Sequence, residues 1–105
     1  MSKLYDKNDD GDWIEARGQV RRLLSDGSDF ERHQRFVVVV DGDQSLLIAH
    51  NLEIADRIPL GLGDRVRFRG IYEYNDSGGV VHFTHRDPHG EEAGGWVEFR
   101  KERYA

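Results

Sequence analysis

The residues best suited to acid–base or ligand chemistry lie in one stretch, residues 78–96, which reads GGVVHFTHRDPHGEEAGGW. It holds His82, His85 and His89, three of the five histidines of the chain, and an Asp-Pro turn at Asp87. Histidine titrates near neutral pH and is also a common metal ligand. The stretch therefore predicts a binding or catalytic loop, with His85 as a general base and Asp87 as its orienting partner.

Two further polar groups are expected to join this loop. Arg32, His33 and Arg35 open a valine-rich segment, where an arginine can hold a phosphate and His33 supplies a titratable group. His50 and Asn51 end an apolar segment. We expect His50 to face the same site, as a second candidate for the catalytic base, and Asn51 to bind ligand or to cap a helix.

Metal binding is an alternative for the histidine loop. His85, Asp87 and His89 lie past the end of a predicted strand and can converge on a divalent ion. His82 and His85 fall on opposite faces of that strand, so they cannot share a metal unless the strand breaks at Thr84. The other interpretation is that the histidines bond to backbone and that Asp87 forms an ordinary turn. The chain has no cysteine, which excludes disulfides, thiolate nucleophiles and cysteine-ligated metals.

The charged residues argue against a protein that coats duplex DNA. There are 15 Lys and Arg against 20 Asp and Glu, a net charge of −5. Arg65, Arg67 and Arg69 nevertheless occupy alternate positions and should share one face of a strand. Arginine suits bidentate recognition of carboxylate or phosphate. The alternative is that these arginines pair with acidic side chains on a solvated face.

An all-β fold is expected to position these groups. Period-two alternation and valine-rich runs predict strands, and turn residues such as Asp41-Gly42-Asp43 separate them. Asn51 should cap a short helix that Pro59 ends, and Gly18 should bend the first strand. The predicted strands span residues 14–20, 33–40, 46–50, 65–74 and 80–85, with a helix at 52–57 and a last strand at 96–104.

This order of elements predicts a five-stranded OB-like barrel with a short helix between strands three and four and a C-terminal extra strand. Residues 1–12 are polar and acidic and should form a flexible tail before a single domain, residues 13–105. OB-like barrels bind ligands across strands two and three and the adjoining loops. The start of strand two, the end of strand three and the histidine loop should therefore meet at one rim.

The chain has no apolar run of about 20 residues, the length that a membrane span needs. Its N-terminus, MSKLYDKNDDGD, lacks the apolar core of a signal peptide. We therefore expect a cytoplasmic protein that does not interact with membranes, and we expect it to be a monomer.

Several blocks of sequence carry a family resemblance: RHQRF (32–36), LLIAHN (46–51), GIYEYN (70–75), GGVVHFTHRDPHG (78–90) and GGW (94–96). Together they resemble a bacterial family of uncharacterised small proteins, the domain of unknown function 3465, over about residues 16–104. The resemblance implies an OB-like barrel and no activity, cofactor or partner. Family members tend to have Trp in place of Phe83 and a second His in place of Arg86, so a role that needs a histidine at 86 does not carry over.

Three classes of function follow from these features. The first is a module that binds an anionic or base-bearing ligand, a nucleotide or a short single-stranded nucleic acid. The second is a phosphodiester hydrolase, metal-dependent or histidine-based, with His50, His85 and Asp87 as catalytic residues. The third is a protein-interaction domain with structural histidines, which docks a partner through an exposed strand edge or near Trp96. The ligand-binding residues predicted for the first class are Arg32, His33, Arg35, His50, Asn51, Tyr72, His82, His85 and Trp96.

Overall fold

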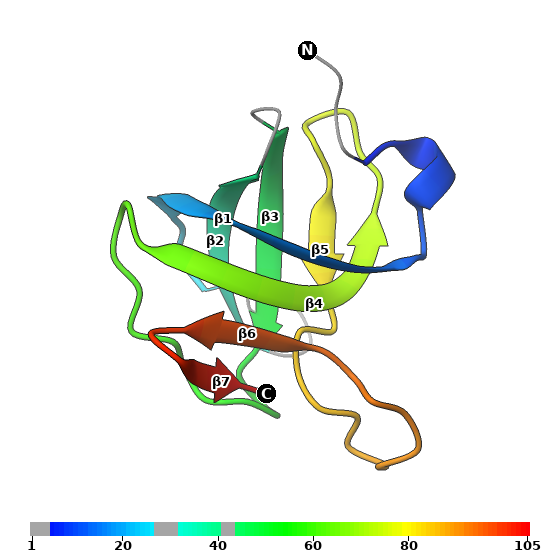
Figure 1. Ribbon diagram of the computed structural model, residues 1–105, viewed down its shortest axis with the longest axis vertical. Coiled ribbons are helices and arrows are strands. Elements are labelled where there is room, and N and C mark those ends of the chain that lie inside the picture. The colour runs from blue at the N-terminus through cyan, green and yellow to red at the C-terminus, as the bar shows by residue number, and fades with distance from the viewer. Residues whose placement is uncertain (1–4, 27–31, 41–43) are drawn as a thin grey trace.

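β-Strands hold about half of the residues in a computed structural model that describes residues 5–26, 32–40 and 44–105 (Figure 1). Within these ranges no helix is long and apolar enough to cross a membrane. The turn predicted at 41–43 lies outside them. The elements are η1 (Lys7–Asp9, a 3-10 helix), β1 (Trp13–Leu23), β2 (His33–Val40), β3 (Gln44–Asn51), β4 (Arg65–Glu73), β5 (Val80–His82), β6 (Trp96–Phe99) and β7 (Glu102–Tyr104).

Five of the strands close into a barrel in the order β1-β2-β3-β5-β4, because β4 pairs back onto β1. β3 and β5 run parallel, and the other pairings are antiparallel. In Figure 1, β1 and β4 cross in front of β2, β3 and β5. This closure confirms the prediction of an all-β fold with a five-stranded barrel.

The C-terminal extension continues the sheet from β4 through β6 and β7. A single strand was expected over residues 96–104. The chain instead turns back at Arg100 and Lys101, whose φ values of 52° and 68° lie in the left-handed region. Two consecutive residues with positive φ match the tight turn that favours a hairpin, so the extension forms two short strands.

The barrel core follows from the period-two alternation in the sequence. Buried and half-buried residues alternate along β2 and over most of β3, and the buried set includes Phe36, Ile48, Phe68, Val81 and Val97, none of them exposed to solvent. The first strand is longer than the predicted span of 14–20. Its irregularity lies between Val20 and Arg22 rather than at Gly18, where pairing with β2 is regular.

The short helix predicted for residues 52–57 is not confirmed. A single turn forms, in which the Ala55 N–H donates to the Asn51 carbonyl at 3.0 Å. The Ile58 N–H then donates to the Gln34 side chain, and the Gln34 amide donates back to the Ile58 carbonyl, both at 2.8 Å. These hydrogen bonds to β2 and the burial of Ile58 hold the chain against the core. A second helical turn is therefore not formed.

Residues 5–12, part of the segment expected to form a flexible tail, contact the barrel. The Gly11 N–H donates to the Tyr72 carbonyl at 2.7 Å, and the Tyr72 N–H donates to the Asp12 carbonyl at 2.8 Å. The Tyr5 ring lies 5.5 Å from the Tyr72 ring, and its backbone exchanges two hydrogen bonds with the Gln44 side chain. An aromatic anchor therefore seats an otherwise polar segment on the end of the barrel.

Candidate functional site

A pocket of about 310 Å³ lies where the start of β2, the end of β3 and the segment after β5 meet. We call it the histidine pocket, because four of the five histidines of the chain line it. The structure thus brings together the three segments that were expected to share a rim. Its lining residues are His33, Asn51, Ile54, His82, Phe83, His85, Asp87, Pro88 and His89.

The pocket exists because β5 ends earlier than the predicted strand 80–85. Phe83 has a φ of 58°, which is uncommon for a bulky residue and stops the extended strand at His82. The Phe83 ring is held edge-on by Trp13 at 5.6 Å and lies 4.4 Å from the His85 ring. The expectation that His82 and His85 lie on opposite faces of one strand therefore does not hold, because the strand ends at His82, and both Thr84 and His85 are buried.

Two glycines close the loop that carries the pocket. The Gly95 N–H donates to the His85 carbonyl at 2.7 Å. A Cβ at Gly95 would collide with the carbonyl oxygens of Phe83 and Arg69, and one at Gly94 would lie 2.6 Å from the Asp87 nitrogen. The GGW block therefore allows β6 to approach the histidine loop more closely than any side chain would permit.

His50 supports the pocket from the barrel interior and has no exposed surface. Its Nδ1 lies 2.9 Å from the Thr84 hydroxyl, and its Nε2 has no hydrogen-bond partner within the described part of the chain. Burial lowers the pKa of His50 to about 4; nearby His85 and His33 act in the same direction and together outweigh contacts with backbone groups. His50 is thus neutral at neutral pH and does not contact the pocket space.

His85 and His82 line the histidine pocket, and each ring contacts a different group. The Nδ1 of His85 lies 2.7 Å from the Arg86 carbonyl, which can only accept a hydrogen bond. In the neutral imidazole the proton therefore sits on Nδ1, and Nε2 carries the lone pair. The Nε2 of His82 lies 3.2 Å from the Glu73 carboxylate. Of the three catalytic residues predicted, His85 alone combines a pocket position with a nitrogen available as a base.

Asp87 shapes the loop through its carboxylate. One oxygen accepts from the His89 N–H at 3.0 Å, and the other accepts from the Glu91 and Glu92 N–H groups at 3.0 and 2.9 Å. These bonds, that from His89 first, lower the pKa of the Asp87 carboxyl. The carboxylate is therefore ionised and already engaged with backbone, which is not the arrangement expected of an orienter for His85.

The predicted divalent metal site receives no support from the geometry. His85, Asp87 and His89 do line the same pocket. However, no group of three histidine or carboxylate side chains in residues 5–26, 32–40 and 44–105 is arranged to hold a metal ion. The Asp87 carboxylate instead accepts hydrogen bonds from three backbone N–H groups of its own loop.

Several predicted ligand residues lie elsewhere. Arg32 is exposed and outside the pocket lining. The Arg35 guanidinium donates to the Ser25 carbonyl at 2.9 Å. Tyr72 is a core residue whose hydroxyl donates to a backbone carbonyl. Trp96 lies on β6 beside the guanidinium groups of two arginines. His33, Asn51, His82 and His85 are the predicted ligand residues that the structure brings together.

The sequence analysis missed a second concave surface. It predicted that the β4 arginines share a face, but not that β1 adds its own arginines beside them. Arg17 is paired directly with Arg67, and both line a groove together with Arg21 and Arg65. The alternating polar positions of β1 carried the signal, but only the register of β1 against β4 shows that the two rows adjoin.

The model of the DUF3465 family, described as a protein of unknown function, matches residues 1–105, the whole chain. The chain belongs to this family. No curated protein and no solved structure matches the chain. Membership confirms the family resemblance seen in the sequence, and it brings no activity, ligand or partner with it.

Proposed function

We propose that the chain is a binding module whose histidine pocket takes an anionic, base-bearing ligand: a nucleotide or the end of a short single strand. One observation carries the proposal. All five histidines meet at this place, four in the pocket lining and His50 close to His33 and His85 beneath it. Imidazoles that line a concavity can donate hydrogen bonds to phosphate and to base edges.

The size and lining of the pocket favour a single nucleotide unit. A volume of about 310 Å³ is at the small end of the range for small-molecule sites. Phe83 and His85 already lie ring against ring, with centroids 4.4 Å apart, and such rings provide a surface on which a base can stack. His89 is exposed at the rim, where a protonated imidazole would meet a phosphate in contact with solvent.

The strand order supports assigning the barrel to the OB class as part of this proposal. The order β1-β2-β3-β5-β4 with a parallel β3–β5 pair places the pocket at adjoining ends of β2 and β3. OB barrels bind oligonucleotides and oligosaccharides over these strands. This support is an analogy at the level of fold, and the histidine chemistry selects the nucleotide from those ligands.

A histidine-based phosphodiester hydrolase is the second candidate, favoured by the tautomer of His85. Its Nε2 can take a proton from water as the oxygen attacks phosphorus, and a protonated neighbour such as His33 can give a proton to the leaving oxygen. This mechanism needs neither Asp87 nor a metal.

A location in the cytoplasm and a monomeric state stay predictions.

Calorimetric titration with 5′-nucleotides and with inorganic phosphate tests the binding proposal. We expect saturable nucleotide binding that strengthens as the pH falls towards the ordinary histidine pKa, because imidazolium binds phosphate more strongly than imidazole. His33→Gln and His89→Gln should each weaken binding by about tenfold, whereas Arg32→Gln should not. Absence of nucleotide binding at any pH at which the fold is intact would reject the proposal, and release of a hydrolysis product would favour the second candidate.

A further inference from the structure

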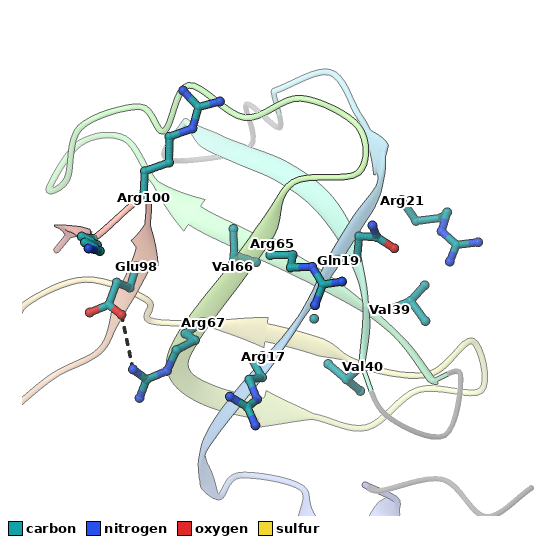
Figure 2. Close-up of a pocket in the computed structure, with 12 residues that line it drawn as sticks. Arg17, Gln19, Arg21, Val39, Val40, Arg65, Val66, Arg67, Glu98 and Arg100 are labelled. Atoms are coloured by element: carbon teal, nitrogen blue, oxygen red, sulfur yellow. Dashed lines mark hydrogen bonds and ion pairs between the residues drawn. The ribbon is translucent and has the colours of Figure 1, made fainter.

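A groove of about 880 Å³ crosses the outer face of β1 and β4 and reaches the β6–β7 turn (Figure 2). We call it the arginine groove. Glu98 is its only acidic lining residue, which is unexpected in a chain of net charge −5. The cations that line it are Arg17, Arg21, Arg65, Arg67, Arg100 and Lys101.

The arrangement of the groove arginines lowers the stability of the barrel. Arg17 on β1 stands directly opposite Arg67 on β4, and Gln19 stands opposite Arg65. Figure 2 shows these side chains on neighbouring strands of one face. Like charges directly opposite each other destabilise an antiparallel pair. An external anion bound to this face would offset the repulsion between the paired arginines.

Most of this positive charge is not neutralised within the protein. Glu98 lies 3.3 Å from the Arg67 guanidinium and 3.4 Å from that of Arg103. Across residues 5–26, 32–40 and 44–105, no ion pair involves Arg17, Arg21 or Arg65. These three guanidinium groups on β1 and β4, each able to bind a phosphate with two hydrogen bonds, are therefore available to a ligand. Arg100 and Lys101 at the β6–β7 turn also form no ion pair within the same residues.

A chain of cation–π and aromatic contacts connects the groove with the histidine pocket. The Arg69 guanidinium lies 4.4 Å from the centre of the Trp13 ring, which contacts Phe83 at 5.6 Å. Phe83 in turn lies 4.4 Å from His85 in the pocket wall. The cross-strand partner of Arg69 on β6 is Trp96, which also borders Arg67, and its partner on β1 is the acidic residue Glu15. Cations and flat rings thus follow β4 from the groove to the pocket.

We infer that the arginine groove binds the phosphate backbone of a single-stranded polynucleotide whose end lies in the histidine pocket. The inference rests on the proposed function and extends it from one nucleotide to a strand. Alternate residues of β4 are about 6.7 Å apart, and the strand runs about 20 Å from Arg65 to Ile71, which pairs with His82. This length suits a few nucleotides, as in other single-strand sites. An acidic peptide would satisfy the arginines but would leave the rings without a stacking partner.

Fluorescence anisotropy with labelled oligothymidylates of about 2 to about 12 nucleotides tests the inference. Affinity should rise with length over the first few nucleotides and then level off. Three neutralised phosphates predict a slope of about −2 for log K against log salt, since each contributes about −0.7 on a single strand. The double variant Arg17→Gln/Arg65→Gln should bring the slope to about −0.7 and weaken binding by at least about tenfold at low salt.

The matched control removes two exposed cations outside the groove, Lys7→Gln/Arg22→Gln, and should leave the slope unchanged. If the groove variant binds oligonucleotides as tightly as the wild type while His33→Gln weakens oligonucleotide binding, the inference fails and the nucleotide proposal stands. If oligonucleotides bind through the groove but mononucleotides do not bind, the strand site stands and the pocket proposal fails. Preference of the groove for polyglutamate over oligothymidylate would overturn the inference in favour of an acidic protein partner.

Discussion

The histidine pocket and the arginine groove are built by opposite means. The pocket depends on irregular backbone: a strand that ends at His82 because Phe83 has a positive φ, a buried His50 beneath the pocket and glycines that close the loop. The groove depends only on the regular register of β1 against β4 and on exposed side chains. Substitution of pocket residues should therefore lower the stability of the barrel, whereas loss of a groove arginine should leave it unchanged or raise it slightly. Substitutions in the pocket and in the groove should therefore differ in their effect on the free energy of unfolding.

The largest effect is expected from Gly95→Val. Its side chain would collide with the backbone oxygens of Phe83 and Arg69, which cannot move without opening the pocket or β4. We expect a loss of about 3 kcal/mol in the free energy of unfolding. Urea denaturation followed by tryptophan fluorescence measures it, since Trp13 and Trp96 flank this contact.

Gly90→Ala is the control for a glycine in the same loop. Gly90 has a φ of 68° but nothing lies within 4 Å of a Cβ built there. The substitution should cost about 1 kcal/mol, from the left-handed backbone alone. Equal losses for the two variants would mean that the close approach at Gly95 does not fix the pocket.

The second effect concerns pH and His50. Its pKa falls from the ordinary 6.5 to about 4 in the folded protein, so the unfolded state binds the proton more readily. Stability should be complete above about pH 6.5 and should fall, by up to about 3 kcal/mol, as the pH drops to about 4. Denaturation at several pH values measures the loss. In His50→Gln this component should vanish, and an unchanged pH dependence would contradict the assignment.

A smaller loss is expected from Thr84→Val. It removes the side-chain hydrogen bond between the Thr84 hydroxyl and Nδ1 of the buried His50 ring. The expected cost is about 2 kcal/mol in unfolding free energy. Ser77→Ala, which removes an exposed hydroxyl, should change stability by less than about 0.5 kcal/mol. A Thr84→Val protein as stable as the wild type would show that His50 finds a new partner.

The smallest effect on stability should come from the groove. Arg17→Gln removes a like-charge contact opposite Arg67 and breaks no ion pair among the described residues. The unfolding free energy should change by less than about 0.5 kcal/mol, and any change should be a gain. Thermal or urea denaturation at low salt is the measurement. A loss above about 1 kcal/mol would show that the groove, like the pocket, supports the barrel.

The regular parts of the fold were accessible from sequence because local patterns determine them. The bounds of β2, His33–Val40, were predicted without error, since β-branched residues and a polar start mark both ends. The alternation of Arg65, Arg67 and Arg69 gave the exposed face of β4. By contrast, the end of β5 depends on the φ of Phe83, which Trp13 and His85 hold in place. No local pattern encodes such a contact.

The candidate site was predicted in part for the same reason. Polar residues at strand ends indicated that His33, Asn51, His82 and His85 would meet. The burial of His50 could not be predicted from the sequence. It depends on Thr84, which turns inward after the end of β5 and contacts the His50 ring. Likewise, Tyr72 was expected in the site but packs with Tyr5 across a long sequence separation. Non-local packing decided each of these cases.

Pairing of β1 with β4, which closes the barrel, also has a kinetic consequence. It joins Trp13 to Ile71 and Gln19 to Arg65, residues that are far apart in the chain. Folding rates of small proteins fall as contacts become less local, so closure should be slow compared with formation of the β2–β3 hairpin. An early intermediate containing that hairpin alone would have neither Arg17 beside Arg67 nor β5 beside β3. Nascent chains would thus gain both surfaces only when folding is nearly complete.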